Sequence, residues 1–302
     1  MPRHRTRRSA LSAASVTAVV LLAGSAAGGA YLAGRSPGPS PAAVASVSSA
    51  SGPPTAAATS EEPEVDLDAE LADVLAPLTA GADVSVAVLD TESGRSAVYG
   101  DGAYDTASIV KVDILAALLL LAQDEGRELS GAEHARADAM ILRSDNTSAT
   151  ELLRAVGGEE GLDAANVRLG LTGTTAAHAW GLTRTTAADQ VRLLQAVFGT
   201  ESELSAASRA YLTDLMGRVE ADQQWGVSAA GDGWALKNGW MPRTTTGLWD
   251  VNSIGRVENG GHTYLVAVLS CGHATKEAGV ALVEEVAEAA VDMTGEALSG
   301  TR

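Results

Sequence analysis

The chain has 302 residues, of which 46% are hydrophobic, so it can bury the core of one domain of about 230 residues beside non-globular segments. Its formal net charge is −17, and from residue 66 onward 16 basic residues stand against 35 acidic ones, a balance that excludes nucleic acid and anionic lipid surfaces as partners. A single cysteine, Cys271, excludes an internal disulfide.

The first 65 residues have the composition of a targeting segment followed by a spacer. Residues 1–34 hold four arginines and then an uncharged, largely apolar run, which predicts a signal peptide or an N-terminal membrane anchor. Small residues at 25–27 offer a cleavage site, while the run is also long enough to span a bilayer, so both alternatives stay open. Residues 35–65 are predicted to form a Pro-, Ala- and Ser-rich linker, and residues 66–298 the functional domain. We therefore expect an extracytoplasmic protein, secreted or anchored to the outer face of the cell membrane, whose only membrane contact is its N-terminal segment.

Periodicity along residues 66–298 predicts a mixed α+β domain. In chain order we expect a helix near Leu67–Leu78, a hairpin over Val84–Tyr99, a long helical stretch to about Phe198 with another helix after it, strands near Trp234–Lys237, Trp249–Val257 and Thr263–Ser270, and a final helix. Because strands at both ends of the domain enclose the helices, the hairpin and the last three strands should share one sheet and the middle should form a helical lobe. A cleft between the sheet and the lobe is the natural site.

The central helix of that lobe carries a serine and a lysine one turn apart. Thr106 can cap a helix that begins near Ser108, which puts the Ser108 hydroxyl and the Lys111 amine on one face. Burial disfavours the ammonium form, so Lys111 could accept the proton of Ser108 while the helix N-terminus stabilises an oxyanion. By itself the spacing is weak, because a serine at a helix start and a snorkelling lysine are common.

Two further motifs follow in the chain. Ser144-Asp145-Asn146 lies in a turn between two predicted helices, and Lys237-Asn238-Gly239-Trp240 lies on a predicted strand. On that strand Gly239 would leave room for a substrate backbone, and Lys237 would bind an anionic group. Each motif alone could be an ordinary turn or strand, but the chain has 18 arginines and only three lysines, and two of those lysines lie in these motifs.

Taken together and in this order, the three motifs resemble those of the penicillin-recognising serine hydrolases, specifically the class A β-lactamases. The resemblance covers nearly the whole domain from about Leu67. It implies a β-lactamase/transpeptidase-like α+β fold, with a five-stranded antiparallel sheet flanked by helices and a helical lobe. It also implies a serine hydrolase that forms an acyl-enzyme on a β-lactam or a cell-wall-type amide.

Carried over position by position, the resemblance makes Ser108 the acylated nucleophile and Lys111 its base. Ser144 would relay a proton to the leaving nitrogen, and Asn146 would bind the substrate amide. The backbone N–H groups of Ser108 and Trp240 would form the oxyanion hole.

Lys237 would supply positive potential beside Ser144 and lower the pKa of Lys111 by repulsion. Arg243 is a second candidate for binding a substrate carboxylate. The five histidines lack metal-ligand spacing and no phosphate loop is present, so we predict no metal and no cofactor. The expected partner is a small-molecule or peptidoglycan-type substrate, and the expected state is a monomer.

The chain departs from the family in two places. Asn238 stands where the family usually has Thr or Ser, so an amide would face the substrate carboxylate. The family's deacylating glutamate has no counterpart in residues 173–183, where His178 is the one candidate for a substitute base. Slow deacylation is therefore expected. A non-catalytic cell-wall-binding or β-lactam-sensing protein stays open as an alternative, as does a tethered scaffold in which the motifs are relics.

Overall fold

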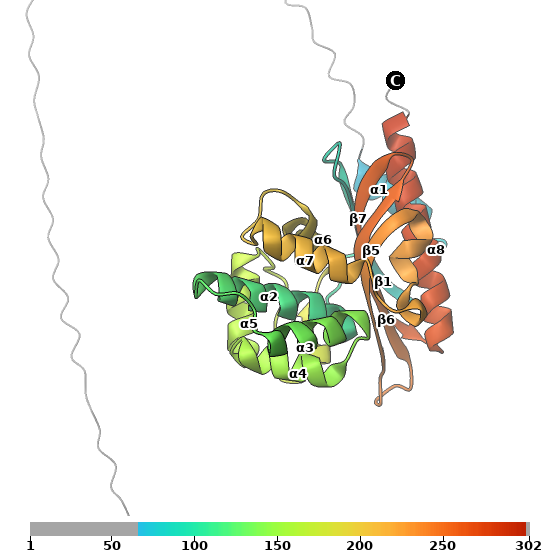
Figure 1. Cartoon of the computed structure of the whole chain (residues 1–302). Coiled ribbons are helices and arrows are strands. Elements are labelled where there is room, and N and C mark those ends of the chain that lie inside the picture. The colour runs from blue at the N-terminus through green and yellow to red at the C-terminus, as the bar shows by residue number, and fades with distance from the viewer. Residues whose placement is uncertain (1–65, 300–302) are drawn as a thin grey trace, which may run out of the picture. The chain divides into compact units, whose positions relative to one another are not determined.

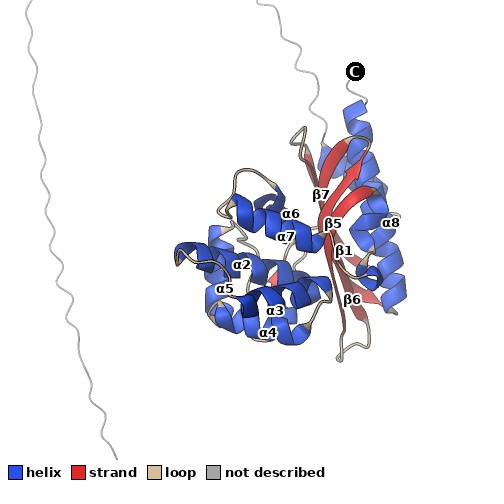
Figure 2. Cartoon of the chain, in the orientation of Figure 1, coloured by secondary structure: helices blue, strands red, loops and turns tan. Residues whose placement is uncertain are grey.

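The computed structural model describes residues 66–299, so the predicted N-terminal segment (1–34) and linker (35–65) lie outside the described residues. Within that described part, no helix is both long enough and apolar enough to cross a bilayer. The described residues fold into a sheet with helices on both faces (Figures 1 and 2).

A five-stranded antiparallel sheet is formed in the order β2-β1-β7-β6-β5, which confirms the predicted fold class. Its strands are β1 (Asp83–Asp90), β2 (Ser96–Tyr99), β5 (Asp232–Pro242), β6 (Trp249–Asn259) and β7 (His262–His273). As predicted, the first hairpin joins the last strands: Val86 of β1 lies opposite Val268 of β7. Gly260 and Gly261 make the β6–β7 turn with φ of +60° and +85°, values that suit a tight hairpin turn and favour glycine.

One face of the sheet is covered by the two terminal helices, α1 (Leu67–Leu75) and α8 (Lys276–Ser299) (Figure 1). Alternate valines of β1 and β7 point to this side and pack with the inward side chains of α8. That packing forms one core, to which Val86, Val266 and Val283 belong, each fully buried.

The other face carries the helical lobe. Its helices are α2 (Val110–Asp124), α3 (Gly131–Leu142), α4 (Asn146–Ala155), α5 (Gly158–Arg168), α6 (Ala187–Phe198) and α7 (Ala206–Met216). The helix α2 is buried on nearly all sides, as its apolar sequence predicts. Figure 2 shows α2 in the middle of the lobe, with α6 and α7 above it and α3 and α4 below it.

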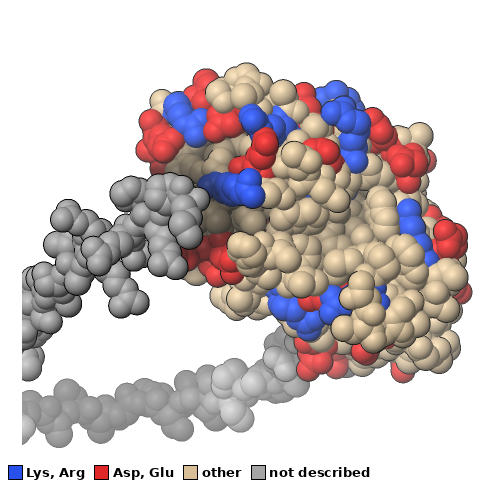
Figure 3. Space-filling view, turned by 90° about the horizontal axis from the view of Figure 1, so that it is seen from below, with Lys and Arg blue, Asp and Glu red and all other residues tan. Residues whose placement is uncertain are grey.

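Two very short strands and four 3₁₀ turns complete the described structure. The strands β3 (Tyr104–Asp105) and β4 (Arg184–Thr185) pair with each other where the chain passes between the sheet and the lobe. The 3₁₀ turns are η1 (Ala107–Ile109), η2 (Trp180–Leu182), η3 (Ala221–Gln223) and η4 (Gly226–Ala230). On the face seen in Figure 3, basic side chains lie in small groups among acidic and uncharged ones.

Candidate active site

The turn η1 presents Ser108 at the start of the buried helix. Ala107 has a φ of +46°, a strained value for a residue with a side chain, of the kind that collects at functional sites. From β6, Asn252 donates to the carbonyls of Asp105 (2.9 Å) and Thr106 (3.1 Å), which fixes the chain just before the serine. The predicted Thr106 cap is wrong: its hydroxyl donates to the carbonyl of Trp180 at 3.4 Å, because η1 bends the chain before α2 begins.

Lys111 lies one turn beyond Ser108 and points at it. Its Nζ is 2.8 Å from Ser108 Oγ, and the side chain is fully buried. Nζ also lies 2.6 Å from the carbonyl of Ser144, 2.9 Å from Ser144 Oγ and 2.8 Å from Asn146 Oδ1. Burial lowers the pKa of Lys111 to about 7, and the attraction of Asp145 only partly opposes this shift. At neutral pH a large share of Lys111 is therefore uncharged and able to accept a proton.

The turn between α3 and α4 supplies the second motif. Asp145 caps α4 by accepting from the Ser148 backbone N–H at 2.7 Å, so the chain must reverse direction just before it. Ser144 makes that reversal with a φ of +56°, a second strained position close to Ser108. The geometry turns Ser144 and Asn146 toward Lys111.

Lys237 reaches the same group from β5. Its Nζ donates to Ser144 Oγ at 3.1 Å, to Gln223 Oε1 at 3.3 Å and to the carbonyl of Asn238 at 2.9 Å, with the side chain fully buried. Burial holds the pKa of Lys237 well below its usual range, and repulsion by Lys111 lowers it further. The expected repulsion between Lys111 and Lys237 disfavours a positive charge on both amines at once.

The next two residues of β5 do not face a ligand as expected. Successive side chains of a strand point to opposite sides, so Asn238 points away from Lys111 and donates to the carbonyls of Gln223 and Trp225, each at 2.8 Å. Its amide is buried and does not line the cleft. Gly239 leaves no room for a substrate backbone either, since a Cβ there would lie 2.7 Å from the Ser108 amide nitrogen.

A cleft of about 380 Å³ opens in front of Ser108. The residues around it come from η1, α4, the η2 loop and β5: Ala107, Ser108, Asn146, Ala179, Trp180, Gly181, Leu182, Trp240, Met241 and Pro242. None of these ten described residues carries a charge. The buried amines of Lys111 and Lys237 lie behind this uncharged wall.

Two tryptophans flank the cleft. The Trp180 ring centroid lies 4.8 Å from Lys111 Nζ, and its indole N–H donates to Thr150 Oγ1 at 3.1 Å. Trp240 packs at 5.9 Å from Trp225, and Lys276 Nζ lies 3.9 Å above the Trp240 ring. All three lysines of the chain therefore lie in or beside the site, a grouping that their scarcity in the sequence only hints at.

The loop that carries Trp180 is anchored by carboxylates of the neighbouring helices. Asp189 accepts from the backbone N–H of Gly173 at 2.7 Å, and Asp163 accepts from that of Ala176 at 2.8 Å. Asp189 is buried as well. Their bonds to the loop backbone make them structural.

The two other candidates lie elsewhere. The side chain of His178 is 99% exposed, with Nδ1 3.2 Å from Glu159 Oε1, so it turns away from Ser108. Arg243 forms ion pairs with Asp105 and, at 3.5 Å, with Asp250 instead of facing the cleft.

Comparison with known proteins places this geometry in a family. The chain resembles the class A β-lactamase reconstructed for the last common ancestor of Gram-negative bacteria, with a TM-score of 0.61 and 24% identity over 75% of this chain and 99% of that one. A class A β-lactamase from Bacteroides cellulosilyticus matches with a TM-score of 0.64 and 17% identity, over 76% of this chain and 98% of that one. The protein PBP-A matches with a TM-score of 0.65 and 22% identity, over 77% of this chain and 97% of that one. Among curated proteins none matches the sequence.

At these identities the solved structures establish the fold alone. A family model described as "Beta-lactamase enzyme family" matches residues 134–294, which is more than half of the chain. That membership supports a serine hydrolase of the β-lactamase type. The protein belongs to the β-lactamase enzyme family.

Proposed function

We propose that the protein is a serine hydrolase that forms an acyl-enzyme on Ser108 with a β-lactam or a cell-wall-type amide. The observation that carries the proposal is the fully buried Lys111, whose Nζ is 2.8 Å from Ser108 Oγ. Few structural roles require a buried lysine to touch a serine hydroxyl, whereas a Ser–Lys catalytic pair does.

The reaction begins when neutral Lys111 takes the proton of Ser108 as Oγ attacks the substrate carbonyl carbon. The carbonyl oxygen becomes an oxyanion, which the backbone N–H groups of Ser108 and Trp240 stabilise. Ser144, between Lys111 and Lys237, passes a proton to the leaving nitrogen as the C–N bond breaks. Asn146 accepts from Lys111 through Oδ1, so its NH₂ is oriented to donate to a substrate amide.

Hydrolysis of the resulting ester is slow. A water needs a base beside the acyl carbonyl, and the described residues around the cleft include no carboxylate and no histidine. The Trp180 ring also lies against Lys111, with its centroid 4.8 Å from Nζ. A PBP-A variant has been solved as an acyl-enzyme complex with penicillin G, a precedent for a persistent adduct on this fold.

The second candidate is a β-lactam-sensing or cell-wall-binding protein that keeps the cleft but performs no turnover. The same lack of a base favours it, because a sensor must hold its ligand longer than a hydrolase does. The two candidates differ in whether a substrate amide is cleaved more than once per protein molecule.

Intact mass spectrometry after mixing with a reporter β-lactam tests both candidates. We expect an adduct on the wild type that persists and none on Ser108→Ala, while Ser96→Ala, at an exposed serine of β2, labels normally. Rapid loss of the adduct with many turnovers would identify an efficient β-lactamase and contradict slow deacylation. Equal labelling of Ser108→Ala would refute the nucleophile.

The setting of this chemistry follows from the N-terminal sequence. We place the hydrolase domain at residues 66–298, outside the cytoplasm, with residues 35–65 as its linker and residues 1–34 as the signal or anchor. The domain acts as a monomer on a small-molecule or peptidoglycan-type substrate. Fusion of residues 1–65 to a periplasmic reporter enzyme tests export, and a reporter that stays inactive would contradict it.

A further inference from the structure

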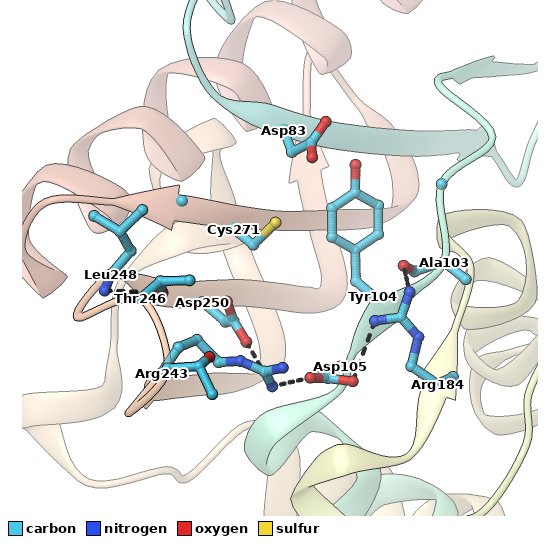
Figure 4. Close-up of a pocket in the computed structure, with 13 residues that line it drawn as sticks. Asp83, Ala103, Tyr104, Asp105, Arg184, Arg243, Thr246, Leu248, Asp250 and Cys271 are labelled. Carbon is cyan, nitrogen blue, oxygen red and sulfur yellow. Dashed lines mark hydrogen bonds and ion pairs between the residues drawn. The ribbon is translucent and has the colours of Figure 1, made fainter.

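A second pocket, of about 340 Å³, lies behind the turn that carries Ser108 (Figure 4). It is built where the short strands β3 and β4 meet β1, β7 and the β5–β6 connection, and among the described residues it shares no wall residue with the cleft of Ser108. Nothing in the proposed acyl chemistry uses it.

The charges on its wall do not balance. Figure 4 shows Arg184 and Arg243 approaching Asp105 from opposite sides, so that both guanidinium groups share one carboxylate. Arg184 Nη1 is 3.2 Å from Asp105 Oδ1, and Arg184 also donates to the carbonyl of Ala103. Asp250 and Asp83 line the pocket too, which gives three carboxylates against two guanidinium groups.

Asp250 is the group left short of partners. Its side chain is 93% buried, yet within residues 66–299 no donor makes a hydrogen bond to its carboxylate. Its one ionic contact is Arg243 Nη1 at 3.5 Å, and that nitrogen is already held by Asp105. The carboxylate opens onto the pocket without a hydrogen bond from a described side chain or backbone N–H, and desolvation raises the pKa of Asp250 to about 6. An incoming donor with a positive charge would relieve both deficits.

The arrangement suits an organic cation better than a metal ion. In the described part of the chain, the one group of acidic and histidine ligand atoms close enough to surround an ion is Asp90, Glu92 and His262, which is not in this pocket. The carboxylates of Asp83, Asp105 and Asp250 are therefore spread around a cavity rather than gathered at a point. The Tyr104 ring and Cys271 supply apolar wall for a short carbon chain.

We propose that this pocket binds a small organic ammonium compound, with the ammonium group at Asp250 and the carbon skeleton along Cys271 and Tyr104 toward Asp83. The site is separate from the acyl chemistry, so either proposal can fail without the other.

Cys271 gives the full-length chain a built-in reporter, because it is the one cysteine of the sequence and lines the pocket. Its thiolate attacks a methanethiosulfonate reagent, forming a disulfide and releasing methanesulfinate. We compare the labelling rates of the 2-aminoethyl reagent, a cation, and the 2-sulfonatoethyl reagent, an anion of similar size. The cation should react faster, and 1,4-diaminobutane at millimolar concentration should slow labelling by protecting the thiol.

Asp250→Asn should reduce the ratio of cation to anion rates by about tenfold, the effect expected from one charge at short range in a partly buried site. The matched control is Asp214→Asn, which removes one charge from an exposed ion pair on α7 and should leave the ratio unchanged. Asp83→Asn, at the exposed rim, gives a smaller reduction and serves if Asp250→Asn does not fold. Equal ratios in the pocket variants and in Asp214→Asn, or no protection by 1,4-diaminobutane, would overturn the proposal.

Discussion

Replacing Gly239 by alanine tests how the sheet holds the nucleophile. The added Cβ would lie 2.7 Å from the Ser108 amide nitrogen, 2.7 Å from the Thr106 carbonyl oxygen and 2.9 Å from the Ile109 amide nitrogen. Ordinary contact begins at 3.4 Å, so β5 and the nucleophile turn must separate by roughly 0.7 Å. All three neighbours are backbone atoms, and no side chain can rotate away to absorb the change.

Two effects should follow from that displacement. Overpacking of a tight contact costs about 1–3 kcal/mol of the free energy of unfolding. The Ser108 N–H, half of the proposed oxyanion hole, moves by a large part of 1 Å, and a misplacement of that size lowers rates by up to about 100-fold. We therefore expect the acylation rate of Gly239→Ala to fall between 10- and 100-fold. The same displacement causes the loss of stability.

The assay pairs two measurements on each variant. Stopped-flow acylation with a chromogenic β-lactam gives the rate, and urea unfolding gives the stability. Gly131→Ala is the control, because a Cβ at that helix position meets nothing within 4 Å. If Gly239→Ala acylates within twofold of the wild type and unfolds at the same urea concentration, the turn does not depend on this contact and the reasoning is wrong.

Three further predictions rest on buried polar groups. The acylation rate should rise about tenfold per pH unit up to about pH 7 and then level off, since Lys111 must lose its proton to act as a base. A flat pH–rate profile would exclude Lys111 as the base. Burial raises the pKa of Asp113 to about 8, above its value of 3.8 in the unfolded chain. The unfolded chain therefore loses this proton first as the pH rises. The free energy of unfolding should fall by up to about 1.4 kcal/mol per pH unit between pH 4 and 8. Asp113→Asn should remove that slope in urea titrations. Asn238→Thr should cost about 2–3 kcal/mol by stranding two buried carbonyls, with faster amide exchange near Trp225 as the readout.

Sequence patterns predicted the sheet and the helices well because those elements are long and regular. The hairpin, the last three strands and the buried helix after Ser108 each repeat one period over many residues. The strands β3 and β4, with two residues each, carry no such period and were not predicted. Their pairing depends on where larger elements bring the chain together.

The sequence predicted which residues converge at the candidate site, but it did not predict the directions in which Asn238 and Gly239 face. Ser108, Lys111, Ser144, Asn146 and Lys237 do converge. Short spacings fix the pairs Ser108 and Lys111, and Ser144 and Asn146, within their own motifs, and the fold then brings the three motifs together. Asn238 and Gly239 were misjudged because the surroundings of a strand residue are set by distant neighbours. Here those neighbours are the backbone carbonyls of Gln223 and Trp225 for Asn238, and the backbone of the turn around Ser108 for Gly239, which no local pattern in β5 encodes.

The position of β1 between β2 and β7 sets the order in which the protein can assemble during synthesis. The ribosome delivers β1 and the nucleophile early, whereas β7, the partner of β1, and β5, the support beneath Ser108, come last. Contacts this far apart in sequence form slowly, after most of the chain is available. A nascent chain that ends before β5 has a Ser108 with no strand under its turn and no Lys237 beside Ser144. If Ser108 acts as proposed, such an incomplete chain lacks the assembled site, and acylation requires a chain that includes β5.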